Sequence, residues 1–67
     1  MTERLFRVSM MHKETREVTD LMVWGESMAD ATCTIIDAIG GDHGEYSWMC
    51  TNSVLRDGEF VEREVEQ

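Results

Sequence analysis

Basic side chains are scarce in this chain of 67 residues, which has six Lys and Arg against fourteen Asp and Glu. The formal net charge is −8 and the sequence pI is about 4.4. The acids run from Glu3 to Glu66 and are not confined to a tail. A folded domain this small must display negative charge over much of its surface. Such a field disfavours direct nucleic-acid binding and contact with anionic membranes, and it attracts basic protein surfaces.

The chain also lacks proline and has only two cysteines, Cys33 and Cys50. Two cysteines are too few for a disulfide scaffold, so we expect a reducing, cytoplasmic location. The alternative is a single disulfide between these two cysteines. No apolar run follows basic residues at the start, and no apolar stretch approaches the ~18 residues of a membrane span. We therefore expect neither a signal peptide nor a membrane partner. The hydrophobic content of 42% instead predicts one small folded domain over residues 1–67.

Hydrophobic patterning predicts an α+β fold in the order β-β-α-β-β, with one helix on a mainly antiparallel four-stranded sheet. The first two strands are expected at Leu5–Met11 and Val18–Trp24, with the polar segment 12–17 as their loop. Ser27 is a good N-cap, and the apolar spacing that follows predicts a helix from about Met28 to Ile39. Gly40-Gly41 would end this helix. Its buried side is expected to include Ile35, Ile36 and Ile39.

The dipeptide Asp57-Gly58 is the strongest local signal, because Asp-Gly between apolar segments favours a two-residue type I′ hairpin. We expect it to join strands at Tyr46–Arg56 and Glu59–Val65. The turn sets four cross-strand pairs: Arg56 with Glu59, Leu55 with Phe60, Val54 with Val61, and Cys50 with Val65. One face of this hairpin then collects Tyr46, Trp48, Cys50, Val54, Val61 and Val65. The other face, away from the predicted core, holds Leu55, Phe60, Met49 and the acids Glu62 and Glu64.

The apolar side chains of the first hairpin fall on both of its faces. If Phe6 lies opposite Val23, the core face holds Phe6, Val8, Met10, Leu21 and Val23. The other face keeps Leu5, Met11, Val18, Met22 and Trp24. One helix covers only one face, so these residues either wrap around the edges or form a contact surface for a second copy or a partner.

Neither a metal site nor an enzyme is predicted. The strong soft ligands are His12, His43, Cys33 and Cys50, and no paired spacing such as C-x-x-C links them. A reactive Cys50–His43 pair is conceivable, but Cys50 is expected on the apolar face, where a thiol is inert. No nucleophile motif or phosphate-binding loop is present, and no cofactor is expected.

The segment RLFRVSMMHKETREVTDLMVWGESMADATCTIIDAIGG resembles small phage-encoded inhibitor proteins in the order of its elements. Phage RNA-polymerase inhibitors have a hairpin, a turn with Glu, an acid-capped helix and a returning strand, and several small anti-CRISPR proteins are similar in size and acidity. The likeness lies in architecture and carries over no individual residues. It implies a non-enzymatic inhibitor acting in the cytoplasm of a bacterial host.

These observations lead to two hypotheses of function. In the first, an acidic protein inhibits a larger nucleic-acid-handling machine by complementing its basic surface or by mimicking a nucleic acid. Glu45, Asp57, Glu59, Glu62 and Glu64 would form its acidic ridge, since alternate strand residues lie ~6.5–7 Å apart, close to the spacing of phosphates. Trp24 or Phe60 would be the apolar anchor. In the second, the chain is a homodimeric accessory protein that assembles through its apolar sheet face.

Overall fold

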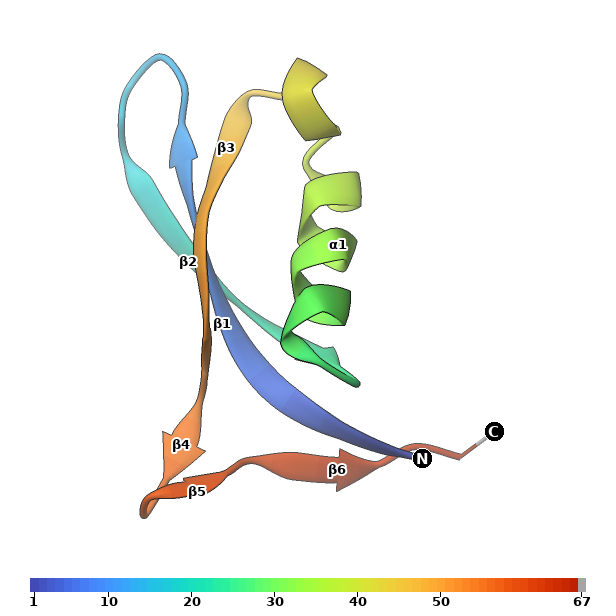
Figure 1. Cartoon of the computed structure of the whole chain (residues 1–67). Helices are drawn as coiled ribbons and strands as arrows, with labels where there is room; N and C mark the ends of the chain where they lie inside the picture. The colour runs from blue at the N-terminus through green and yellow to red at the C-terminus, as the bar shows by residue number, and fades with distance from the viewer. Residues whose placement is uncertain (67) are drawn as a thin grey trace.

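The computed structural model describes residues 1–66 and confirms the α+β class, with one helix packed on an antiparallel sheet (Figure 1). The elements in chain order are β1 (Thr2–His12), β2 (Val18–Gly25), α1 (Met28–Ala38), the short 3-10 helix η1 (Gly41–His43), β3 (Tyr46–Ser53), β4 (Leu55–Arg56), β5 (Glu59–Phe60) and β6 (Glu62–Glu64). Strand β1 starts three residues earlier than predicted and includes His12, which the sequence placed in the loop.

Strand β1 is the centre of the main sheet. It pairs with β2 along one side and with both β3 and β6 along the other. Phe6 lies opposite Val23, as predicted for the first hairpin. A bulge interrupts the β1–β3 register between Ser9 and Met10, so Cys50 faces Ser9 whereas Trp48 faces Met10. The bulge sets Met49 between two paired residues and changes the facing of the strand at that point.

The helix forms where the sequence predicts it, and both of its ends have the expected chemistry. The Ser27 side chain accepts a hydrogen bond from the Asp30 amide at 3.1 Å, and the Asp30 carboxylate accepts from the Glu26 amide at 3.0 Å. These bonds satisfy donors that a helix N-terminus leaves unpaired, and an acid there also suits the helix dipole. Gly40 follows the last turn with φ of +87°, a left-handed conformation that glycine adopts without strain.

The predicted long C-terminal hairpin is wrong beyond its tip. Residues 46–56 do not form one strand, and Cys50 does not face Val65; instead β6 pairs with β1, with Glu62 opposite Arg4 and Glu64 opposite Thr2. The β1 strand is 11 residues long, and β3 pairs with it only from Phe6 to His12. The β6 strand continues that edge and bonds the backbone groups that β3 leaves without a strand partner.

The tip of the hairpin does form. Asp57 and Gly58 both have positive φ, +51° and +81°, as a type I′ turn requires. Leu55 faces Phe60 and Arg56 faces Glu59, as predicted. At the base, the Val61 amide donates to the Val54 carbonyl at 3.4 Å. Strands β4 and β5 therefore make a small separate sheet that projects from the edge of the main one (Figure 1).

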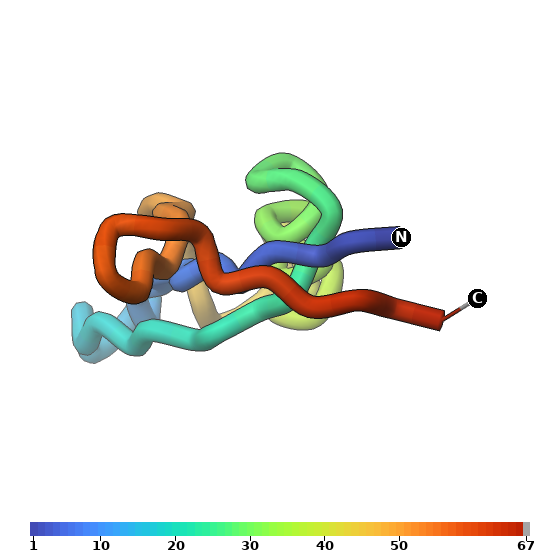
Figure 2. The backbone as a smooth tube through the Cα atoms, turned by 90° about the horizontal axis from the view of Figure 1, so that it is seen from below, coloured from blue at the N-terminus to red at the C-terminus, as the bar shows by residue number. Residues whose placement is uncertain are grey.

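The hydrophobic core is small. It consists of side chains from β1 and α1, which are Phe6, Val8, Met10, Ala31 and Ile35. Leu21 was predicted to be buried and is 39% exposed. Ile36 and Ile39 were also predicted to be buried but are half-buried. Ile36 lies beside the stripe of Ala31 and Ile35 that faces the sheet, whereas Ile39 packs against the edge of the core at the C-cap of α1. The Cα trace is only 13 Å thick, and Figure 2 shows the terminal segments running side by side away from the helix.

Candidate functional site

The structure brings four of the seven predicted contact residues to one small hollow. Asp57, Glu59, Phe60 and Glu62 line it, from the β4–β5 hairpin and the start of β6. Glu64 follows two residues further along β6. We call the acids among them, Asp57, Glu59, Glu62 and Glu64, the C-terminal acidic cluster. All four are exposed to solvent.

The chain's own groups contact two of these acids. The Arg4 side chain bonds Glu62 at 3.3 Å, and its guanidinium lies over the Phe60 ring at 4.2 Å from the ring centre. Thr2 donates to the Glu64 carboxylate at 2.9 Å. Phe60 is 47% exposed, so Arg4 covers one side of the ring and leaves much of the rest accessible. The two ion-paired side chains are about half exposed, and such pairs contribute little to stability.

Glu62 and Glu64 lie on the helix side of β1, which corrects the expectation that they point away from the core. Glu62 faces Arg4, and Arg4 shares a face with Phe6 two residues along the same strand. The expectation failed because it paired this segment with β3.

Trp24 lies on the opposite face of the sheet from the acidic cluster. It faces Leu5, and the Arg63 guanidinium stacks on its ring at 4.6 Å. Arg63 also bonds Glu3 at 2.8 Å. Trp24 is half-buried beneath this arginine. It therefore does not lie beside the cluster as an apolar anchor, and Phe60 is the aromatic residue that does.

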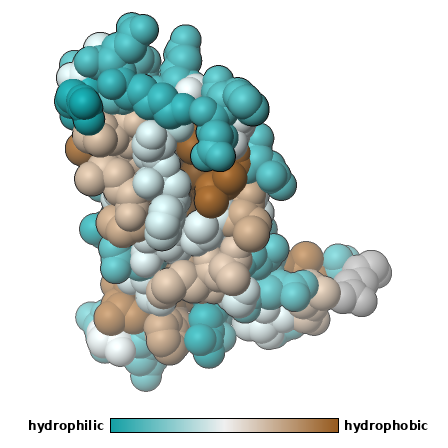
Figure 3. All heavy atoms as spheres, turned by 45° about the horizontal axis from the view of Figure 1, so that its top comes forward, coloured by the Kyte–Doolittle hydropathy of each residue, from teal (hydrophilic) through white to brown (hydrophobic). Residues whose placement is uncertain are grey.

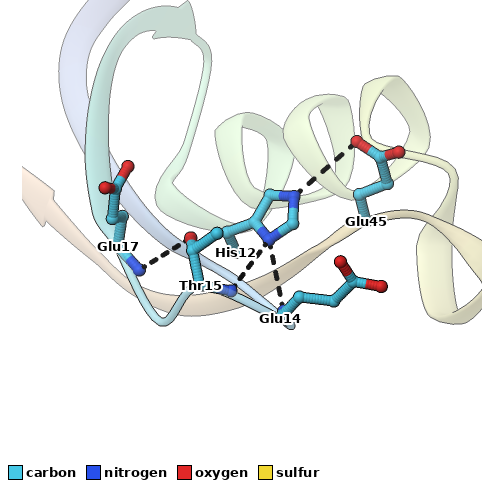
Figure 4. Close-up of polar contacts among 5 residues, drawn as sticks. All are labelled: His12, Glu14, Thr15, Glu17 and Glu45. Atoms are coloured by element: carbon cyan, nitrogen blue, oxygen red, sulfur yellow. Dashed lines mark hydrogen bonds and ion pairs between the residues drawn. The ribbon is translucent and has the colours of Figure 1, made fainter.

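Glu45 lies at the other end of the molecule. It precedes β3, and its carboxylate is 3.8 Å from Nε2 of His12, as Figure 4 shows. The Nδ1 atom of His12 accepts from the amides of Glu14 and Thr15, at 3.2 and 3.3 Å. The His12 ring thus holds the β1–β2 loop and faces Glu45. The whole length of β3 separates Glu45 from the C-terminal acidic cluster, so the predicted ridge is not continuous.

The two cysteines are free and exposed, so the prediction that Cys50 lies on a buried apolar face is wrong. Cys50 lies opposite Ser9, next to the bulge that interrupts the β1–β3 register. Within residues 1–66, no group of three or more His, Cys, Asp or Glu side chains is arranged to hold a metal ion. None of the helices in that same range is long and apolar enough to span a membrane.

A groove between α1 and β3 was not predicted from the sequence. One hollow of about 620 Å³ lies at the N-terminal half of α1, lined by Met28, Ala29, Thr32, Cys33, Trp48, Cys50 and Thr51. A second of about 240 Å³ lies at the C-terminal half, where Ile36 and Ile39 meet Tyr46, Ser47 and again Trp48. Trp48 lines both hollows, which follow one another along α1 and β3, and we call the pair the α1–β3 groove.

The sequence held a signal for this groove. No Lys or Arg occurs between Val18 and Leu55, although six acids do, and β3 has no charged residue at all. The apolar residues Ala29, Cys33 and Ile36 recur at helical spacing beside the buried stripe of Ala31 and Ile35. A helix with two adjacent apolar stripes has more apolar surface than one sheet face covers.

Comparisons with known proteins identify no relative of this chain. No protein-family model, no curated protein and no solved structure matches the chain. The C-terminal acidic cluster and the α1–β3 groove are therefore the candidate sites, on the strength of their own residues.

Proposed function

We propose that this protein is a non-enzymatic inhibitor that docks its acidic surface on the basic surface of a larger nucleic-acid-handling machine. A CRISPR effector and a bacterial RNA polymerase are the two classes of target that the resemblance to small phage-encoded inhibitors suggests. Inhibition would follow from covering the basic surface with which such a machine binds phosphates, or from imitating those phosphates. The protein would act in the cytoplasm of the bacterial host.

The observation that carries the proposal is the distribution of charge. The 38 residues from Val18 to Leu55 contain no Lys or Arg. Of the six basic residues outside that range, Arg4 and Arg63 are bonded to Glu62 and Glu3. The remaining acids outnumber the remaining bases, and they extend over both ends of the molecule and the outer side of α1. A surface of one sign produces a field that steers an oppositely charged partner.

The extent of exposed surface supports a binding role. A compact monomer of 7.7 kDa has an accessible area of about 4,300 Å², whereas this chain exposes 4843 Å². Nine large hydrophobic side chains are among those exposed, which is more than the five that form the core. Apolar side chains beside carboxylates are the composition that a protein contact surface needs.

Inhibition assays test the proposal directly. Purified protein is added to transcription by a bacterial RNA polymerase and to target cleavage by guide-loaded CRISPR effectors. We expect near-stoichiometric inhibition of one of them, which weakens steeply as the salt rises and the screening length shortens from ~10 Å at 0.1 M. Capture from bacterial lysate, with mass spectrometry, identifies other targets. If no assay is inhibited and salt-sensitive capture recovers no nucleic-acid-handling protein, the proposal is wrong.

A homodimer is the second candidate, because the face of the sheet away from α1 has exposed apolar side chains among polar ones such as Arg7 and Asp20. Val18 and Met22 are each 57% exposed on it, beside the half-buried Leu5 and Met11. A second copy placed there would bury this surface, although two chains of charge −8 repel each other. Sedimentation equilibrium separates the two candidates. A dimer that survives high salt and dissociates in Met22→Glu, but not in Glu14→Gln, favours assembly as the role of this face.

A further inference from the structure

The edge of β3 is an open strand edge. Within the part of the chain that the structure describes, β3 pairs with β1 alone, so its second edge faces outward. The Val54 amide donates a hydrogen bond to the Leu5 carbonyl of β1. Because backbone groups alternate in direction along an antiparallel strand, the amide and carbonyl groups of Ser53 and Thr51 point away from β1. Proteins usually protect such edges with charged side chains, proline or β-bulges. The eight residues of β3 include no charged residue and no proline, and the bulge at Met49 leaves the pairing of Cys50–Ser53 regular.

The α1–β3 groove runs along this open edge. Figure 1 draws β3 in front of the other strands with α1 beside it, and Figure 3, tilted from that view, shows hydrophobic atoms exposed beneath a hydrophilic rim. The floor is firmly built, since the hydroxyls of Thr32 and Thr51 are 2.6 Å apart and Nε1 of Trp48 donates to Thr51 at 2.9 Å. These bonds fix the strand, the helix and the indole relative to one another.

A strand edge beside a helix is a geometry that receives extended peptides. The peptide adds to the edge through main-chain hydrogen bonds, and its alternate side chains enter the space between strand and helix. Here that space is lined by Ala29, Cys33 and Ile36 from α1 and by Trp48 from β3. The β3 strand spans roughly 26 Å at ~3.3 Å per residue, long enough for three or four inward side chains.

The charge around the groove selects the occupant. Asp30 and Asp37 on α1 and Asp42 and Glu45 beyond it are the charged residues of the segment 27–55, with no Lys or Arg among them. The one cation at the groove is Lys13, whose Nζ donates to the Asp42 carbonyl at 2.8 Å. A second copy would bring another acidic groove against this one. A segment with Lys or Arg on either side of alternating apolar residues complements it.

We propose that the α1–β3 groove binds an extended segment of the target, with apolar residues at alternate positions and basic residues at its ends, as an added strand on β3. This rests on the proposed function, and it names the part of the basic partner that the protein recognises. The C-terminal acidic cluster would then guide the approach, and the groove would hold the segment.

The test uses a synthetic peptide, Arg-Arg-Val-Thr-Val-Thr-Val-Arg-Arg, and the isotope-labelled full chain observed by NMR. A matched peptide has the same side chains but N-methylated alternate amides, which prevents pairing with an edge. A third replaces the arginines with glutamates. We expect the first peptide to shift the amides of Tyr46–Ser53 and of α1, and both other peptides to bind at least about tenfold more weakly.

A pair of variants locates the site on the protein. Ala29→Arg places a long cation in the groove, whereas Ala38→Arg makes the same change at an exposed helix position outside it. Both positions tolerate arginine in a helix, and melting curves verify that both variants fold. We expect Ala29→Arg to weaken the first peptide about tenfold or more and Ala38→Arg to change its affinity less than about twofold.

Several results would overturn the proposal. Equal affinity of the N-methylated peptide would exclude strand addition, and equal affinity of the glutamate peptide would exclude a basic occupant. Amide shifts of Tyr46–Ser53 on dilution without peptide would identify a second copy as the occupant. No binding of the first peptide, or amide shifts confined to residues 57–64, would exclude the groove as the binding site. The inhibition assays remain independent of these results, so the proposed function stands or falls separately.

Discussion

Single side chains hold the loop end of the molecule together, and His12 is the clearest case. Its Nδ1 accepts from two consecutive amides of the β1–β2 loop, so one ring satisfies two backbone donors. Its other ring nitrogen, Nε2, lies 3.8 Å from the carboxylate of Glu45, the residue directly before β3. The ring therefore ties the first hairpin to the segment that leads into β3.

Replacing His12 with alanine should free those amides. We expect hydrogen exchange at Glu14 and Thr15 to speed up markedly, with a loss of about 0.5–1.5 kcal/mol in unfolding free energy per hydrogen bond removed. His43→Ala is the control, because His43 is exposed in the neighbouring loop and has no bond to these amides. Unchanged exchange in His12→Ala would mean that the ring does not order the loop.

Ile35 is the residue on which the core depends most from the helix side. It is 6% exposed and packs with Val8 and Met10. We expect Ile35→Ala to lower the unfolding free energy by about 2–5 kcal/mol, as large-to-small core changes do. Asp37→Ala, on the exposed side of α1, should change it by less than about 0.5 kcal/mol. Urea denaturation measures both, and similar midpoints for the two would contradict the observed packing of α1.

Among the elements, α1 and the Asp57-Gly58 turn are the ones that local chemistry specifies. The N-cap bond of Ser27 and the left-handed Gly40 involve residues within a few positions of each other. The turn likewise needs only two residues with positive φ. Neither depends on which strand lies beside it, so both were predicted from the sequence with their correct positions.

The β4–β5 hairpin provides a test at this scale. Gly58 has φ of +81°, which a β-branched residue resists, so Gly58→Val should cost about 1–2 kcal/mol locally. Because this hairpin is a separate small sheet, we expect the NMR signals of Leu55 and Phe60 to change while those of Phe6 and Val8 persist. Asp57→Asn should preserve the turn, since Asn adopts positive φ readily. Loss of the whole fold in Gly58→Val would show that the hairpin is not independent.

Strand pairing is where the sequence reasoning failed, and the acidic cluster shows the consequence. Glu62 and Glu64 were placed on the far face because β6 was paired with β3. The real partner is the start of β1, 58 to 62 positions away in the chain. Either pairing satisfies the backbone of β6, and the apolar pattern of this segment is too weak to choose between them. The face of the sheet on which each β6 side chain lies then depends on which strand β6 pairs with.

At the scale of the whole molecule, charge and shape act together. The Cα radius of gyration is 12.8 Å, whereas about 11 Å is expected for a compact chain of this length. The excess comes from the thin sheet and the projecting hairpin and β6. These projections carry the C-terminal acidic cluster, so the most extended part of the protein is also strongly acidic.

Reversing that charge should slow association with the target. We expect Glu62→Lys with Glu64→Lys to lower the association rate about tenfold at low salt and much less at high salt, because steering is electrostatic. Glu14→Lys with Glu17→Lys makes the same change in net charge in the exposed β1–β2 loop, away from both candidate sites. Stopped-flow or surface-binding measurements compare the two pairs. An equal effect of both would mean that net charge, and not this cluster, guides the approach.

The sequence by itself determined the acidic character, the α+β class, the helix with its caps and the tight turn, because each depends on composition or on residues close together in the chain. Only the tertiary structure decided the partner of β6, the face on which Glu62 and Glu64 lie, the separation of Glu45 from them and the open edge beside α1. These depend on which of several distant segments pairs with β1. Apolar residues on both faces of the strands leave that choice open until the whole sheet, its bulge and the helix packed on it form together.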